Sequence, residues 1–219
     1  MNGLFTQESR TRGGAVFTAL ISLLVGMVAS SAALAVDNTQ FGYAGAEAGD
    51  WGGASGAIIG PADGTCANMG AVGKVNLASN FGFAIPGGAT ITAVTAYVKA
   101  GENGPQNVDL QLAADASVDP PTLLGTANTL AVAGTGGSCA STTVVSVGTT
   151  PASWGTTSAA ILAVVNSSDF GLVFTKTEAS SIKVDAMCLQ ISYTTAAGEA
   201  TLEECFQEPP PDNNQITVV

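Results

Sequence analysis

Hydrophobic and polar residues alternate in short stretches of this chain, as they do in β-strands that bury one face. The clearest case is Val108-Asp-Leu-Gln-Leu-Ala, in which the large aliphatic residues share one face and the polar residues share the other. Further strands are predicted at 141–147, 170–175 and 182–193. The stretch 159–165 has helical spacing instead, which predicts a single helical turn.

The longest β-prone run follows a well-defined turn. Pro86 fixes its own φ angle, and Gly87 and Gly88 tolerate positive φ, so a turn is predicted just before the run Thr90–Val98. Thr, Val, Ile and Tyr residues in that run favour a pleated sheet. We therefore expect Leu77–Lys99 to form the first hairpin of an all-β, antiparallel sandwich.

Two of these strands change hydrophobic phase part-way along. The change falls between Ile91 and Val94 in one strand and between Val184 and Met187 in the other. An extra residue in each strand would return both phases to the core. The predicted β-bulges lie near Thr92-Ala93 and near Asp185-Ala186.

The first 35 residues follow the pattern of a secretory signal peptide. Arg10 and Arg12 precede an uncharged run, and Ala33 and Ala35 have the A-x-A spacing of a cleavage site. We expect cleavage after Ala35 and a secreted or cell-surface protein. The uncharged run is also long enough to span a bilayer, so an uncleaved N-terminal anchor helix is the alternative.

The remaining chain is divided into three parts. We expect a linker rich in Gly and Ala at 36–50, one β-sandwich domain at 51–195 and an acidic, proline-containing tail at 196–219. The tail ends in Ile216-Thr-Val-Val219, a β-prone segment that could add a strand to the open sheet edge of a neighbouring subunit. A disordered terminus is the alternative.

Charge is sparse and mostly negative. Seventeen acidic residues face six basic ones, and the chain has no His. Nucleic acid and anionic membrane surfaces are therefore poor partners, and membrane contact is expected only if the N-terminal helix is retained.

The same composition argues against catalysis. Without His, no Ser-His or Cys-His nucleophile pair can form, and acids such as Glu203-Glu204 more often solvate a tail than face each other as in a glycosidase. Calcium could be held by aspartates, but no repeated Asp-x-Asp loop is present. The aspartates considered for calcium are Asp63, Asp109, Asp115 and Asp119. We therefore expect no enzyme, no cofactor and no metal site.

The four cysteines are Cys66, Cys139, Cys188 and Cys205. They lack Cys-x-x-Cys spacing, which argues against zinc and, in an exported chain, favours disulfides. Four cysteines allow three pairings, and sequence alone does not choose among them. The loop-rich surroundings of Cys66 and Cys139 favour that pair, which leaves Cys188 to hold the tail through Cys205.

Three groups of residues together resemble a known module. They are Trp51 with Asp63–Ala67, Phe81–Pro86 with Ala89–Ile91, and Trp154-Gly155 with Asp169–Leu172 and Val184–Tyr193. In order and spacing these groups resemble a jelly-roll-like β-sandwich module of bacterial secreted and surface proteins and phage-associated sequences, mostly of unassigned function. The resemblance spans Trp51–Thr194 and implies export and a jelly-roll-like fold, without a set of catalytic residues.

Two functions fit these observations. We expect a structural or adhesive surface protein, which could self-associate, from the small side chains, the cysteines and the lack of a convergent polar site. The alternative is a carbohydrate-binding module that presents aromatic rings to a surface glycan, with Trp51 and Trp154 as contacts and Tyr43 and Tyr97 as further candidates. Exposure of the two tryptophans decides between these functions, because a buried ring cannot stack on a ligand.

Overall fold

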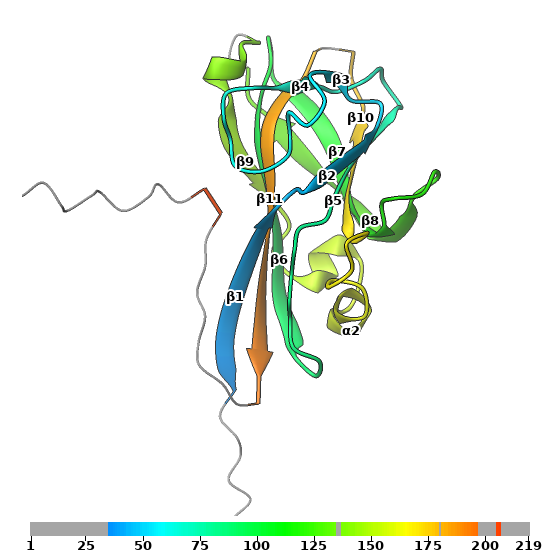
Figure 1. Cartoon of the computed structure of the whole chain (residues 1–219). Helices are drawn as coiled ribbons and strands as arrows, with labels where there is room; N and C mark the ends of the chain where they lie inside the picture. Colours follow the sequence, from blue (N-terminus) through cyan, green and yellow to red (C-terminus); the bar gives the residue numbers. More distant parts are fainter. Residues whose placement is uncertain (1–34, 135–136, 180, 197–204, 207–219) are drawn as a thin grey trace, which may run out of the picture. The chain divides into compact units, whose positions relative to one another are not determined.

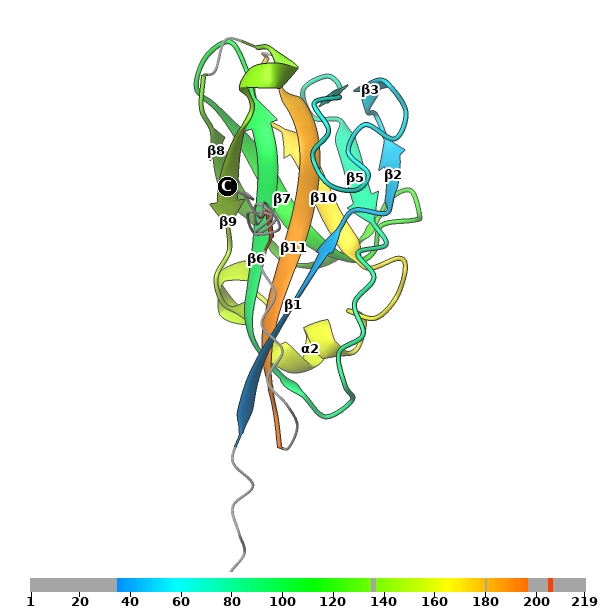
Figure 2. The ribbon, with the colours of Figure 1, turned by 60° about the vertical axis from the view of Figure 1, so that its left-hand side comes forward.

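Antiparallel pairing of strands builds two facing sheets (Figures 1 and 2). The structure is a computed structural model that describes residues 35–134, 137–179, 181–196 and 205–206. Sheet A contains β1 (Val36–Tyr43), β3 (Gly52–Gly53), β4 (Ala67–Asn68), β6 (Thr90–Gly101), β9 (Thr143–Val147) and β11 (Lys183–Thr195). Sheet B contains β2 (Ala46–Gly49), β5 (Val75–Ser79), β7 (Gln106–Asp115), β8 (Thr122–Val132) and β10 (Gly171–Lys176).

Most strands that are neighbours within a sheet come from parts of the chain that are far apart in sequence. Sheet A has the order β3-β4-β11-β6-β9, and β1 pairs with the part of β11 that β4 leaves open. Sheet B has the order β2-β5-β10-β7-β8. Many connections lead from one sheet to the other, and these are β5–β6, β6–β7, β8–β9, β9–β10 and β10–β11. The chain therefore crosses repeatedly between the two layers.

Short helices occupy two of the connections between sheets. The 3-10 helix η1 (Cys139–Ser141) precedes β9, and η2 (Pro151–Trp154) with α2 (Ser158–Leu162) lies between β9 and β10. Helix α2 confirms the predicted helical turn. Its first turn is capped by the side chain of Thr157, which accepts from the Ala160 N–H at 3.2 Å.

The core lies between the sheets and takes alternate residues from each strand. Val108, Leu110 and Leu112 of β7 are buried, as predicted, whereas Asp109 and Gln111 lie on the other face and are partly exposed. Burying each such aliphatic side chain contributes about 1.5–3 kcal/mol. The predicted strands at 141–147, 170–175 and 182–193 correspond to β9, β10 and β11.

Both predicted bulges are present in the pairing of β6 with β11. The register shifts between Val184 and Ala186, which leaves Asp185 without a partner residue on β6. It shifts again where Ser192 pairs with Ala93 and Tyr193 pairs with Ile91, so that Thr92 is the extra residue.

The predicted hairpin at Leu77–Lys99 is wrong. The turn itself is present, with the Ala89 N–H donating to the Pro86 carbonyl at 3.2 Å, but β5 belongs to sheet B and β6 to sheet A. The connection buries three large side chains on its way between the sheets, and these are Phe81, Phe83 and Ile85. Those side chains belong to the core between the sheets, so the connection is a crossover and not a tight hairpin loop.

The expectation of a linker at 36–50 also differs from the structure. Strand β1 pairs residue for residue with β11 from Val36 opposite Thr195 to Tyr43 opposite Cys188. Gly42 allows the segment after β5 to pass close to β1, because a Cβ atom there would collide with the Phe81 carbonyl. The sandwich therefore begins at Val36.

Other expectations fall on residues that the structure does not describe. Of the predicted signal peptide or anchor, residues 1–34 lie outside the described residues, and of the tail only residue 196, Cys205 and Phe206 lie within them. Among the described residues, no helix has the length and apolar character needed to cross a membrane.

Candidate functional site

Trp154 is a core residue and cannot contact a ligand. Its side chain is fully buried at the end of η2, and its indole N–H donates to the Val94 carbonyl of β6 at 2.9 Å. The short helix is fixed by a capping box in which the side chains of Thr150 and Ser153 each accept from the other residue's backbone N–H. The prediction that Trp154 contacts a glycan is therefore wrong.

Trp51 lies between β2 and β3, packs against the core between the sheets and is only partly buried. Its indole N–H donates to the Leu77 carbonyl at 2.9 Å, and its ring centroid lies 5.9 Å from that of Phe174. These two contacts hold the ring in one orientation. One part of the side chain borders a surface hollow of about 220 Å³, so Trp51 keeps access to a ligand.

The Trp51 hollow is formed by strand β2 and the segment that follows it. Its lining consists of Glu47, Ala48, Gly49, Trp51, Gly53, Ala54 and Ser55. The Gly56 N–H donates to Glu47 Oε1, which fixes the direction of the carboxylate. Glu47 Oε2 is buried and has no hydrogen-bond partner in the described part of the chain. The lining of the hollow thus contains one aromatic and one acidic residue.

A second hollow of about 170 Å³ lies beside the first, on the outer face of sheet B. It is lined by Ala48, Gly49, Asp50, Val75, Leu77, Ser117, Val118 and Asp119. A small separate apolar cluster underlies this part of the face and includes Leu77, Ala113, Ala116 and Val173. Sequence reasoning missed this cluster, because Leu77 and Val173 fall on the face that the alternation assigns to solvent.

Asp115, at the end of β7, leads into the loop beside the second hollow. The Ser117 hydroxyl donates to Asp115 Oδ1 at 2.7 Å and the Ser117 N–H donates to it at 2.8 Å. Both bonds stabilise the charged carboxylate and hold the pKa of Asp115 below its ordinary value.

Replacing Ser117 by alanine should raise the pKa of Asp115 toward its ordinary value, because the stronger of the two donors is lost. A carboxyl whose pKa is depressed on folding stabilises the fold above its unfolded pKa and loses that contribution as pH falls through its folded pKa. The S117A variant should therefore protonate Asp115 at higher pH. Carboxyl carbon NMR titration of both proteins measures the change, and an unaltered pKa would contradict it.

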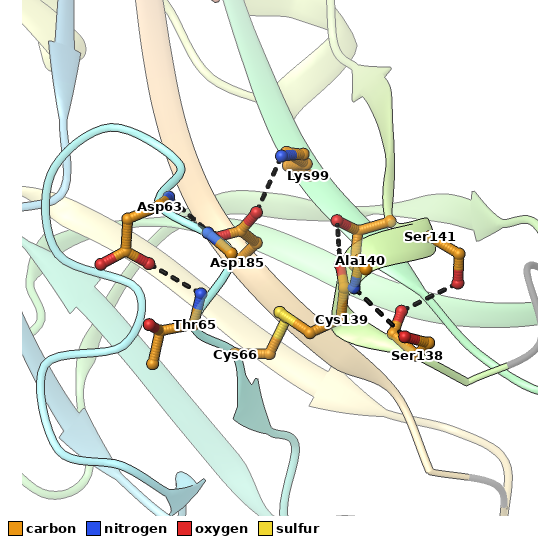
Figure 3. Close-up of a disulfide and its surroundings, with 11 residues drawn as sticks. Asp63, Thr65, Cys66, Lys99, Ser138, Cys139, Ala140, Ser141 and Asp185 are labelled. Carbon is orange, nitrogen blue, oxygen red and sulfur yellow. Dashed lines mark hydrogen bonds and ion pairs between the residues drawn. A yellow bond between two sulfur atoms is a disulfide. The ribbon is translucent and has the colours of Figure 1, made fainter.

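The pair Cys66–Cys139 forms a disulfide with a Cα–Cα distance of 5.7 Å, as the sequence favoured. The bridge joins the segment before β4 to η1 (Figure 3). Next to it lies the bulge residue Asp185, whose buried carboxylate accepts from the Asp63 and Gly64 N–H groups at 3.2 and 3.1 Å. Lys99 Nζ lies 2.8 Å from Asp185 Oδ2. These contacts fasten the loop before β4 to the outer face of sheet A.

The pair Cys188–Cys205 forms the second disulfide and confirms the other favoured pairing. Phe206 packs edge-on against Tyr43 with 5.4 Å between ring centroids, and its N–H donates to the Tyr43 hydroxyl at 3.1 Å. Cys205 and Phe206 are therefore fixed to the outer face of sheet A. Two disulfides indicate an oxidising compartment.

The aromatic residues proposed for glycan contact do not converge on one surface. Tyr43 is engaged by Phe206, and Tyr97 lies across β11 from it, opposite Cys188. Trp51 lies at the margin of the core between β2 and β3, and Trp154 lies within the core. Of the four candidates, Trp51 alone lines either of the two hollows described here.

The aspartates considered for calcium are likewise dispersed. Asp63 lies in the loop before β4, Asp109 and Asp115 lie on β7, and Asp119 follows β7. Within the described ranges, no group of three or more Cys, Asp or Glu side chains is placed to hold a metal ion.

Comparison with known proteins yields little similarity. No protein-family model and no curated protein matches the chain. A similar solved structure is the exo-β-1,3-galactanase from Phanerochaete chrysosporium with galactose, at 15% sequence identity and a TM-score of 0.34. The match covers 73% of this chain and 29% of the galactanase chain, so this chain spans less than a third of that enzyme. At this level of similarity, the match carries no argument about function.

Proposed function

We propose that this protein is a non-catalytic structural or adhesive protein of the cell exterior that associates with copies of itself. The observation that carries this proposal is the β8–β9 side, the side of the sandwich formed by the edge strands β8 (Thr122–Val132) and β9 (Thr143–Val147). The two strands lie next to each other at the left of Figure 2. Neither contains a charged residue or a proline.

An edge strand of this composition favours pairing with another strand. Its outer N–H and C=O groups are open to a partner, and soluble proteins commonly block such edges with charged residues or proline. Val144 of β9 is 46% exposed and Leu123 of β8 is 50% exposed, so apolar side chains accompany the open backbone groups. Four of the five residues of β9 are Thr or Val, which favour a sheet.

Electrostatics favours the same side for contact between two copies. The chain has a net charge of −11, so two copies repel each other. The opposite edge of sheet B is β2, whose neighbourhood carries Glu47 and Asp50. Two copies that meet at the uncharged β8–β9 side bring the fewest like charges together. Antiparallel pairing of β9 with the β9 of a second copy would continue sheet A through a two-fold axis.

A non-catalytic role is supported by the use that the fold makes of two buried charges. Asp185 accepts from two backbone N–H groups and pairs with Lys99, and Lys176 Nζ donates to the Gly70 carbonyl at 2.9 Å. Both side chains hold loops in place, as structural groups do.

We also assign the sandwich to the jelly-roll class. In sheet A the strands have the order β1-β11-β6-β9, and they face the strands of sheet B, which have the order β5-β10-β7-β8. Along the sequence, each of these eight strands lies in the other sheet from the strand before it, except β8, which follows β7 within sheet B. This is the order expected when two Greek keys are wound into one sandwich. The strand order agrees with the module that the sequence resembles.

Glutamates on β9 should weaken self-association. The variant V144E/S146E places two charges on the outward positions of the edge strand, where a partner strand would bury them. The variant V72E/V118E adds the same charge at two other exposed positions and is the matched control. Sedimentation velocity should show oligomers for the wild type and the control and a monomer for V144E/S146E. Equal oligomeric states in all three proteins would contradict the proposal.

Carbohydrate binding is the second candidate function. Trp154 is lost as a contact, but the partly exposed Trp51 still borders a hollow.

A further inference from the structure

We propose that the segment Ile216–Val219 docks as an additional strand along the open edge of β1 in its own chain. Strand β1 is the edge of sheet A on the side away from β9, so this inference does not depend on self-association at the β8–β9 side. Three observations carry it. They are the outward backbone groups of β1, the attachment of Phe206 at one end of that strand, and the sequence that follows Phe206.

Every second residue of β1 directs its backbone N–H and C=O groups away from β11. The Ala44 N–H donates to the Met187 carbonyl, which continues the register of β1 with β11 by one residue. Because hydrogen-bonded pairs alternate along an antiparallel ladder, the even-numbered residues of β1 bond to β11 and the odd-numbered ones face outward. The outward residues are Asp37, Thr39, Phe41 and Tyr43. No described strand pairs with this side of β1.

Segment 81–84 covers the inner face of β1 and not this edge. The Gln40 side chain donates to the Ala84 carbonyl at 3.4 Å and accepts from the Ala84 N–H at 3.1 Å. A Cβ atom at Gly42 would collide with the Phe81 carbonyl. Gln40 and Gly42 lie opposite buried core residues of β11, so both face the inside of the sandwich. The edge groups of β1 are thus left as a template for a further strand.

The disulfide Cys188–Cys205 brings the chain back to the outer face of sheet A, close to this edge. Cys188 lies on β11 opposite Tyr43 of β1. Phe206 contacts the ring of Tyr43 and donates its N–H to the Tyr43 hydroxyl at 3.1 Å. From Cys205 to Phe206 the chain has therefore passed from β11 to β1. Neighbouring strands are about 4.8 Å apart, so the position of a further strand is only roughly 5 Å beyond β1.

The sequence after Phe206 provides a spacer and then a segment suited to a sheet. Pro209, Pro210 and Pro211 lack an N–H group and favour an extended chain, so the spacer cannot itself form a regular strand. At ~3.1 Å per residue, residues 207–215 reach about 28 Å, and the eight residues of β1 span about 26 Å. All four residues of Ile216–Val219 are β-branched and uncharged. The segment can therefore reach any part of β1.

Docking within one chain is favoured over docking on a second copy. The disulfide holds the segment near β1, and a tether of this kind gives an effective concentration in the millimolar range. A second copy must instead approach against the repulsion between two chains that each have a net charge of −11. With the edge of β1 covered, sheet A can still extend through β9 but not through β1.

The test measures amide hydrogen exchange by NMR in the full chain and in a variant that lacks residues 216–219, each at two protein concentrations. The outward N–H groups of β1 should exchange about tenfold more slowly in the full chain, and equally at both concentrations. The inward N–H groups are bonded to β11 and should exchange alike in both proteins, which shows that β1 stays folded. The inward groups used as this reference are those of Asn38, Gln40 and Gly42.

The matched control is N213A/N214A, which changes two residues of the spacer and keeps the segment, and it should exchange like the full chain. Three outcomes would overturn the proposal. They are equally fast exchange of the outward groups with and without residues 216–219, equal loss of protection in N213A/N214A, and protection that grows with concentration, which would mean that a second copy covers the edge. None of them concerns residues 143–147 of β9, which report self-association.

Discussion

A variant in which Cys66 and Cys139 are both replaced by serine is expected to have a free energy of unfolding about 4 kcal/mol below that of the wild type. The two cysteines are 73 residues apart, and a cross-link over such a long loop strongly restricts the unfolded chain. Urea denaturation followed by circular dichroism measures the difference. The variant C188S/C205S, which removes a bridge of separation 17, should lose about 3 kcal/mol.

The surroundings of the first bridge add to its effect. The loop before β4 is otherwise held by the bonds of the Asp63 and Gly64 N–H groups to Asp185. Without the bridge, non-covalent contacts must hold the loop over a buried carboxylate, and these also include the bond of the Gly60 N–H to the Ala44 carbonyl and the buried side chain of Ile58. A greater loss of stability in C188S/C205S than in C66S/C139S would contradict the expectation that the bridge over the longer loop contributes more to stability.

The second large effect is expected at Trp154. Replacing it by alanine should cost about 3–5 kcal/mol, because a fully buried indole leaves a cavity that the core can fill only in part. Replacing it by phenylalanine should cost less, about 1–3 kcal/mol, mainly because the Val94 carbonyl loses its donor. The same urea experiment measures both changes.

An exposed position provides the control for Trp154. Val144→Ala removes a side chain that is 46% exposed and should change stability by no more than about 0.5 kcal/mol. If Trp154→Ala were as stable as Val144→Ala, the indole could not be a core residue. Trp154 would then again be a candidate for ligand contact.

Strands whose hydrophobic phase can be read locally were predicted correctly. In β7 the buried Val108 and Leu110 are each followed by a polar residue, so the face of this strand can be assigned without knowing its partners. The bulge at Asp185 was also predictable, because the strand would otherwise expose either Val184 or Met187. Local sequence contains this information because it concerns one strand and its own two faces.

Features that depend on distant partners were not predictable in the same way. Strand β1 contains the buried polar residues Asn38 and Thr39, and its place in sheet A depends on pairing with residues about 150 positions away. The crossover between β5 and β6 looks like a hairpin in sequence, because a turn alone does not say whether its two strands share a sheet.

The residues of the candidate site likewise depend on partners that local sequence does not reveal. Trp51 and Trp154 are each followed by glycine, and nothing local separates them. The core takes Trp154 because Gly148 leaves room for its ring, since a Cβ there would collide with the indole. The acceptor at Glu47 was missed, because its environment is set by the Gly56 backbone nine residues away.

Self-association through β9 is tested most directly by backbone amide hydrogen exchange of the wild type at two protein concentrations. Pairing of β9 with a second copy would protect its outward N–H groups, so the exchange of residues 143–147 should slow as the concentration rises. The exchange of β2 on the opposite edge should stay the same. Protection that appears at β2 instead, or no dependence on concentration at either edge, would contradict the proposed assembly.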